Sequence, residues 1–125
     1  MRVLLDTHVL LWWLGDDPAL SAEARAAIAD PGSDVLVSAA SVWEISIKQA
    51  LGKLRAPDDL LVQLERHRFW RLPVTDVHAL RAGALPRLHD DPFDRMLVAQ
   101  AAQEGLCIAT RDPAFAAYDV PLLAA

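Results

Sequence analysis

Short apolar runs alternate with helix-like segments along the whole chain, and this alternation restricts the possible folds more than any other feature of the sequence. Strands are predicted at residues 2–6, 35–38, 69–74, 106–110 and 120–123, and helices at 8–14, 21–30, 39–51, 58–67, 75–84, 92–104 and 113–117. The strand runs are almost continuously apolar, which is typical of parallel strands covered on both faces. We therefore predict one α/β domain, residues 1–125, with a parallel sheet of about five strands flanked by helices on both faces.

The composition indicates a globular protein of a reducing compartment. Hydrophobic residues make up 54% of the chain and charged residues 23%, which excludes a disordered protein. The longest apolar run, residues 9–14, is too short to cross a bilayer, and no signal peptide is visible. The single cysteine, Cys107, lies in an apolar run and is predicted to be a buried, inert thiol. We expect a cytoplasmic protein with no membrane partner.

The net charge of −5 argues against a protein that binds nucleic acid through a broad basic face. Ten of the twelve lysines and arginines, however, lie between Lys48 and Arg111. This part of the chain can contact a few phosphates, provided that a metal ion lets them approach the acidic residues.

A carboxylate follows the first predicted strand directly. Asp6 comes after Val3-Leu4-Leu5, and open α/β sheets bind their ligands at the carboxyl ends of the strands. Aspartate is also a favoured helix N-cap, but Thr7 can cap the next helix equally well. We interpret Asp6 as a metal ligand and keep the N-cap as the alternative.

Glu44 lies within the helix predicted at 39–51, among apolar neighbours such as Trp43 and Ile45. A surface ion pair with Lys48, four residues later, would explain it. The apolar neighbours instead place the carboxylate at the margin of a core, beside a cleft or in a poorly solvated position. The sequence leaves both interpretations open.

Three further acids stand at helix starts. Asp91-Pro92-Phe93-Asp94 has an acid at the N-cap, proline at the first helical position and an acid at the third. Capping explains Asp91 well and Asp94 only in part, and a helix N-terminus also keeps a ligand carboxylate ionised. Asp112 repeats the pattern of a cap followed by proline, directly after the strand 106–110. Acids that converge from several strand ends are the donors that a hard divalent metal requires.

Other polar and aromatic residues give weaker signals. Arg95 and Arg111, each beside an acid, are solvated charges or salt-bridge partners unless they contact phosphate. The four histidines are isolated and lack zinc-site spacing, so zinc is not expected. The four tryptophans have apolar neighbours and are interpreted as core or interface residues rather than as platforms for stacked bases.

Four sequence blocks resemble those of PIN domains, and most of all the VapC toxins of bacterial toxin–antitoxin modules. The blocks are Leu4–His8, Ser38–Ile45, Asp91–Ala101 and Thr110–Asp112, in the family's order and across essentially the whole chain. The resemblance implies a magnesium-dependent ribonuclease, a VapB antitoxin that inhibits it by binding, and a toxin homodimer. Carried over by position, the four acids of the family are Asp6, Glu44, Asp94 and Asp112, with Asp91 as an accessory residue.

These points together predict an endoribonuclease that uses Mg²⁺ or Mn²⁺. Asp6 and Asp94 would bind the ion directly, while Glu44 and Asp112 would hold it through water or bind a second ion. Arg95 or Arg111 would contact substrate phosphates. A non-cleaving RNA- or protein-binding module is the main alternative. A haloacid-dehalogenase-like phosphatase is a weaker one, because that family needs a second aspartate where this chain has His8.

Overall fold

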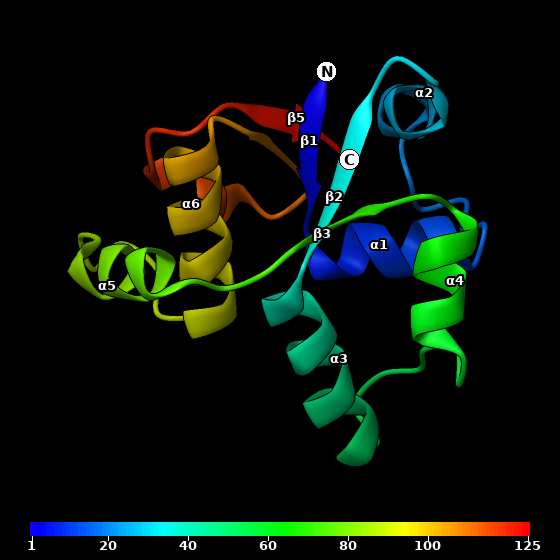
Figure 1. Ribbon diagram of the computed structural model, residues 1–125, viewed down its shortest axis with the longest axis horizontal. Helices are drawn as coiled ribbons and strands as arrows, with labels where there is room; N and C mark the ends of the chain where they lie inside the picture. The colour runs from blue at the N-terminus through cyan, green and yellow to red at the C-terminus, as the bar shows by residue number, and fades with distance from the viewer.

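A five-stranded parallel sheet with helices on both faces forms the frame of the protein, as the computed structural model of residues 1–125 shows (Figure 1). The strands are β1 (Arg2–Leu5), β2 (Asp34–Ser38), β3 (Trp70–Leu72), β4 (Cys107–Thr110) and β5 (Leu122–Ala124). The helices are α1 (Thr7–Leu14), α2 (Ala22–Ala29), α3 (Ala39–Ala50), α4 (Leu60–Arg66), α5 (Asp76–Ala84), α6 (Pro92–Glu104) and the 3-10 helix η1 (Pro113–Ala117). The predicted α/β class and the parallel sheet of five strands are confirmed.

Alternate residues of the central strands supply two apolar cores, one on each face of the sheet. Val3 and Leu5 of β1 belong to the core that includes Leu64 of α4. Leu4, between them, belongs to the other core, together with Leu97 of α6. This division follows from the two-residue repeat of a strand, which sends successive side chains to opposite faces. Figure 1 accordingly shows α5 and α6 on one side of the sheet and α1, α2 and α4 on the other.

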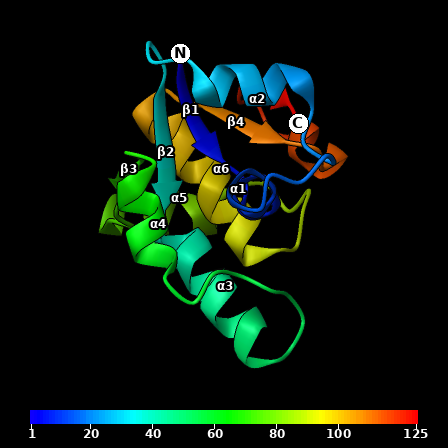
Figure 2. The same ribbon diagram turned by 90° about the vertical axis from the view of Figure 1, so that its right-hand side faces the viewer.

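The direction of the chain through the sheet reverses at β1. The strand order is β3-β2-β1-β4-β5, so the chain first moves outward from β1 in one direction and later returns to fill the other side. Such a reversal opens a crevice at the carboxyl ends of the strands, where α/β proteins bind ligands. Figure 2 shows β1 and β2 running toward the same end of the molecule, where α1 and α3 begin. Asp6 follows β1 and Asp112 follows β4, so both predicted ligands belong to this end of the sheet.

Trp43 and Trp70 lie outside the core, since each is 62% exposed, so of the two predicted roles only that of an interface residue is left for them. Two other expectations need correction. Cys107 is only half-buried, although burial still raises the pKa of its thiol and keeps it protonated. The third strand is shorter than predicted, because it ends at Leu72, before the proline at position 73 that lacks an N–H for the ladder. No helix is long and apolar enough to cross a membrane.

Candidate active site

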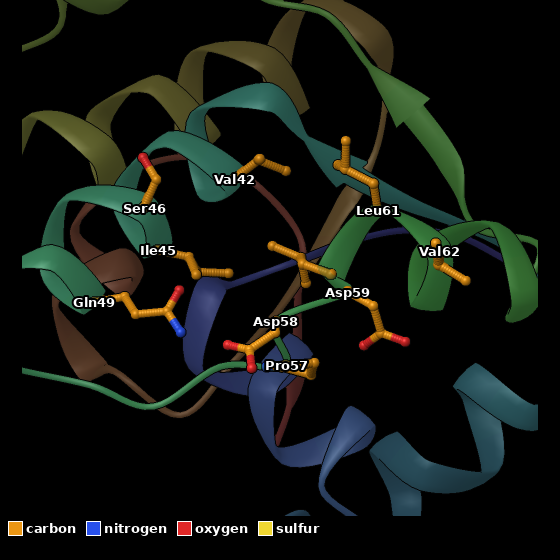
Figure 3. A pocket seen from close by; sticks show the side chains of 10 residues that line it. Val42, Ile45, Ser46, Gln49, Pro57, Asp58, Asp59, Leu61 and Val62 are labelled. Atoms are coloured by element: carbon orange, nitrogen blue, oxygen red, sulfur yellow. The ribbon is translucent and has the colours of Figure 1, made fainter.

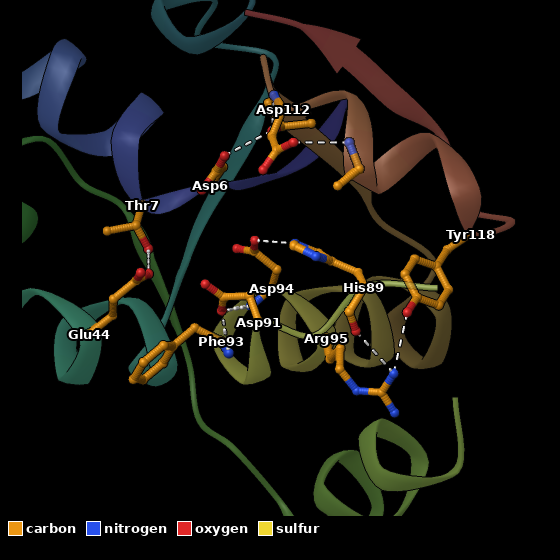
Figure 4. A network of polar contacts seen from close by, with 12 residues as sticks. Asp6, Thr7, Glu44, His89, Asp91, Phe93, Asp94, Arg95, Asp112 and Tyr118 are labelled. Atoms are coloured by element: carbon orange, nitrogen blue, oxygen red, sulfur yellow. Dashed lines mark hydrogen bonds and ion pairs between the residues drawn. The ribbon is translucent and has the colours of Figure 1, made fainter. Parts of the chain in front are cut away.

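Five carboxylates line one small cavity at the carboxyl ends of β1 and β4 (Figure 4). The cavity has a volume of about 160 Å³, and its walls are Asp6, His8, Trp12, Glu44, Lys48, Asp91, Asp94, Arg111 and Asp112. The four acids predicted as ligands and the accessory Asp91 therefore meet in one place, although they come from four separate parts of the chain.

Asp6 lies at the buried base of this cavity, with 6% of the residue exposed. Its Oδ2 accepts a hydrogen bond of 2.8 Å from Thr110 Oγ1 of β4, and it makes no side-chain capping bond to α1. The N-cap interpretation of its carboxylate is therefore wrong. Burial raises the pKa of Asp6, against the hydrogen bond from Thr110, which lowers it.

Glu44 projects from α3 and has both carboxylate oxygens engaged. Its Oε1 accepts a hydrogen bond of 2.6 Å from Thr7 Oγ1, and its Oε2 pairs with Lys48 Nζ at 2.5 Å. The ion pair considered in the sequence thus exists, but its setting is not the open surface, because Glu44 is only 5% exposed. The hydrogen bond to Glu44, together with the charges of Asp91 and Asp94, raises the pKa of Lys48.

The start of α6 places two acids beside each other. Asp91 is the N-cap, and its Oδ1 accepts hydrogen bonds from the backbone N–H groups of Phe93, at 2.8 Å, and Asp94, at 3.1 Å. The predicted cap is confirmed. Asp94 extends from the first turn and its Oδ2 meets Nε2 of His89 at 2.7 Å. Burial, with the nearby charges of Asp91 and Asp6, raises the pKa of Asp94 to about 7 despite the opposing effect of His89.

His89 is the site residue that the sequence did not reveal. Its ring pairs with Asp94, and the ligand atoms of His89, Asp94 and Asp112 all lie within 4.8 Å of one another. The hydrogen bond to Asp94 raises the pKa of His89. The available signal was its position five residues before Asp94, on the loop that leads into α6, which a search for paired histidines passes over.

The donor set fits a hard divalent cation. Carboxylate oxygens predominate and no cysteine lines the cavity, which suits Mg²⁺ or Mn²⁺ better than zinc. A carboxylate whose pKa is raised by burial and by like charges is stabilised in its ionised form when a cation arrives. The residues present therefore agree with a metal site.

The chain matches the PIN domain family over residues 3–121. It belongs to that family. It is 34% identical over 114 residues to Ribonuclease VapC22 of Mycobacterium tuberculosis, an alignment that covers 88% of this chain and 86% of the relative.

Solved structures share the fold of this PIN domain. VapBC2 from Rickettsia felis, bound to a DNA fragment from its promoter, matches with a TM-score of 0.72 at 13% identity, over 98% of each chain. A toxin–antitoxin complex from Klebsiella pneumoniae matches with a TM-score of 0.69 at 18% identity, over 98% of this chain and 96% of the other. The resemblance to VapC-type PIN domains is confirmed.

The two arginines near the acids of this PIN domain have different surroundings. The guanidinium of Arg111 lies 4.4 Å from the ring centre of Trp12, and both residues line the acidic cavity. Trp12 therefore forms a wall of the site and, as predicted, also packs against the apolar core. Arg95 does not line the cavity. It donates hydrogen bonds to the backbone carbonyls of Ala82, Leu85 and Pro86, and so fixes the loop before α6. The structure gives Arg95 this structural role and offers no support for a phosphate contact.

A larger cavity of the PIN domain, about 430 Å³, lies between α3 and the start of α4 (Figure 3). Its lining combines apolar side chains such as Ile45 and Leu61 with Asp58 and Asp59. None of the four family acids contributes to it, and no cationic side chain lines it beside its two aspartates. Although this cavity is larger than the acidic one, its lining does not indicate a catalytic site.

Proposed function

We propose that this PIN domain is a Mg²⁺-dependent endoribonuclease, the toxin of a VapBC-type module, and that Mn²⁺ can replace Mg²⁺. The observation that carries the proposal is the convergence of five carboxylates in one cavity at the crevice of the sheet. The name of the relative from M. tuberculosis, a ribonuclease, supports RNA as the substrate. Acids grouped without enough local cations accommodate a phosphodiester only when a metal ion is present.

Asp6 and Asp94 are proposed to hold the ion directly. Asp112 is a third candidate, because its oxygen lies within 4.8 Å of the donor atoms of Asp94 and His89. Glu44, whose two oxygens are already engaged, acts through water. When bound, the ion supplies positive charge at the scissile phosphate and a water of lowered pKa for in-line attack. Mg²⁺ usually keeps several waters, which agrees with so few direct protein ligands.

The surrounding residues orient these acids. Thr110 fixes one oxygen of Asp6, Asp91 holds the backbone N–H of Asp94, and His89 fixes the Asp94 carboxylate. Arg111 is the cation of the cavity wall that we assign to a substrate phosphate, since it lines the cavity and Arg95 does not. The chain's own groups therefore position the acids and attract the substrate, while two of the acids carry the ion.

The proposal includes two protein partners. Structural neighbours are crystallised as VapBC or toxin–antitoxin complexes, which supports a VapB-type antitoxin that inhibits this chain in the cytoplasm. A homodimer is supported by an apolar hollow at the starts of α3 and α6. There the exposed ring of Trp43 packs edge-on against that of Phe93, with 5.3 Å between the ring centres. Sedimentation analysis of the chain and of Trp43→Glu tests the dimer. Identical monomeric behaviour of both would contradict it.

RNA cleavage by the purified, antitoxin-free chain tests the function. We expect cleavage with Mg²⁺, none with a chelator, and products that carry a 5′-phosphate and a 3′-hydroxyl. Asp6→Asn should abolish the activity. Cleavage that survives both chelation and Asp6→Asn would refute the proposal. An absence of cleavage together with an absence of calorimetric metal binding would leave a non-cleaving binding module.

A further inference from the structure

Glu44 differs from the other four acids of the cavity in how its oxygens are used. In each of four aspartates, one carboxylate oxygen accepts or shares a hydrogen bond: Asp6, Asp91, Asp94 and Asp112. Glu44 alone uses both, one toward Thr7 and the other toward Lys48. Its end of the cavity is therefore closed by the protein itself, whereas the opposite end keeps carboxylate oxygens for an external cation.

Lys48 lines the cavity and is held there by its position on α3. It follows Glu44 by one helical turn on α3, so the rigid helix holds the two side chains on the same face. The Lys48 side chain is 32% exposed and that of Glu44 6%, and both line the cavity. A solvated surface pair would leave both heads in water. Here the ammonium group instead pairs with buried Glu44, and the negative charges of Asp91 and Asp94, at the start of α6, also act on it.

The charges of the cavity wall point to a single divalent ion. Five carboxylates face two permanent cations, Lys48 and Arg111, which leaves a formal charge of −3. One divalent ion reduces this charge to −1. A second ion would make the net charge of the cavity positive, so electrostatic attraction does not favour its binding. Arg111 donates a hydrogen bond to the backbone carbonyl of Ala125 and stacks on the ring of Trp12, and no hydrogen bond joins it to Glu44. Lys48 is therefore the cation that compensates the acids on the Glu44 side.

We propose that Lys48 takes the place of a second metal ion, so that the site binds one divalent cation at the end formed by Asp6, Asp94 and Asp112. This inference rests on the proposed metal-dependent function and adds the number of ions and the group that replaces the second. Lys48 acts through Glu44 and is a positioning residue. Loss of its charge opens one oxygen of Glu44 to the cavity and creates room for another cation.

Calorimetric titration of the full-length, antitoxin-free chain with Mn²⁺ at pH 8, without RNA, tests the number of ions. We expect one ion per chain for the natural sequence and for Lys48→Arg, which keeps the charge. Lys48→Met should bind a second ion, and its RNA cleavage should require a higher Mg²⁺ concentration with a steeper concentration dependence. Lys53→Met, which removes an exposed lysine outside the cavity, is the matched control and should match the natural chain in both measurements.

The outcomes separate this inference from the proposed function. Binding of no ion by the natural chain would refute both. Two ions on the natural chain, or a single ion on a Lys48→Met protein that melts normally, would refute the role of Lys48 and leave the function intact. A raised KM for RNA with unchanged metal binding would make Lys48 a substrate contact and also refute the inference. If Lys48→Met does not fold, the number of Mn²⁺ ions bound by Lys48→Gln and by the natural chain tests the role of Lys48 instead.

Discussion

Two clusters of polar groups lie at opposite ends of α6, and their hydrogen-bonding partners differ in kind. At the far end, His78 of α5 is 1% exposed. Its Nδ1 accepts a hydrogen bond of 3.1 Å from the Thr75 backbone N–H, and its Nε2 then carries the proton and donates to Glu104 at 2.9 Å. At the start of the helix, Asp94 faces other carboxylates.

The difference between the clusters lies in the balance of donors and acceptors. The cluster around His78 alternates them, so its two ring nitrogens are satisfied without any ligand. The acidic cavity collects groups that only accept when ionised, and burial with mutual repulsion raises the pKa of Asp6 and Asp94. The first arrangement stabilises the fold. The second would be completed by the proposed cation, and substitutions in the two places should have opposite consequences.

Asp94→Asn should produce the largest change. It removes a proposed metal ligand, so RNA cleavage should fall by roughly 10²-fold or more, beyond what loss of an orienting neighbour costs. Because the substitution also removes a buried charge from among like charges, the metal-free protein should keep or gain stability. Cleavage assays and thermal melts in chelator measure both. A variant that is unfolded at room temperature would show instead that Asp94 is part of the fold's support.

His78→Ala should show the reverse behaviour. The substitution leaves the Thr75 N–H and the Glu104 carboxylate without their partner and opens a small cavity, which should cost about 2–4 kcal/mol of unfolding free energy. Cleavage per folded molecule should stay unchanged well below the melting temperature. Urea titration and RNA assays give the two values, and Val77→Ala, at an exposed neighbouring position of α5, serves as control. A loss of cleavage that matches Asp94→Asn would remove the distinction between the clusters.

The sequence predicted the parts of the site that depend on strand ends and helix starts. Continuous apolar runs and capping patterns placed Asp6, Asp91 and Asp112 correctly, because each stands at the position directly before a helix. The pairing of His89 with Asp94 and the engagement of Arg95 by a loop depend on how that loop folds back. Such contacts join segments through loop geometry, which no local periodicity encodes.

The burial of Glu44 shows the same limit. Its pairing with Lys48 follows from a spacing of four residues on a helix, and the sequence revealed it. Whether that pair faces solvent or a cavity depends on the packing of α1 against α3, which brings Thr7 to the other oxygen of Glu44. Thr7 and Glu44 are thirty-seven positions apart in the sequence, so local sequence patterns could not predict their contact.

Acidity should change the stability of the metal-free protein in a direction set by the acidic cavity. The folded-state pKa values of Asp94, about 7, and of His89 are both raised, so each favours the folded state at low pH and loses that contribution as pH rises through its folded-state pKa. Unfolding free energy in chelator should therefore fall between pH 6 and 8, by on the order of 1 kcal/mol. Urea midpoints measure the change.

Two controls make this pH prediction specific. Asp94→Asn should flatten the slope, because it removes the titrating carboxylate and the partner that raises the pKa of His89. Saturating Mg²⁺ should stabilise the natural chain more at pH 8 than at pH 6, since a metal competes with protons for the ligands. A slope that is unchanged by Asp94→Asn would place the titrating groups outside the cavity.

Thr75→Ala should give the smallest effect and tests whether the two clusters are independent. The Thr75 hydroxyl accepts a hydrogen bond of 3.2 Å from the backbone N–H of His78 and so caps α5. Its loss should cost about 1 kcal/mol, and Thr75→Ser should restore most of it. Because the backbone N–H of Thr75 still reaches His78, the ring should keep its place and RNA cleavage should be unaffected. Reduced cleavage by Thr75→Ala below its melting temperature, recovered in Thr75→Ser, would mean that α6 couples the His78 cluster to the acids, and the two ends of the helix would then form one functional unit.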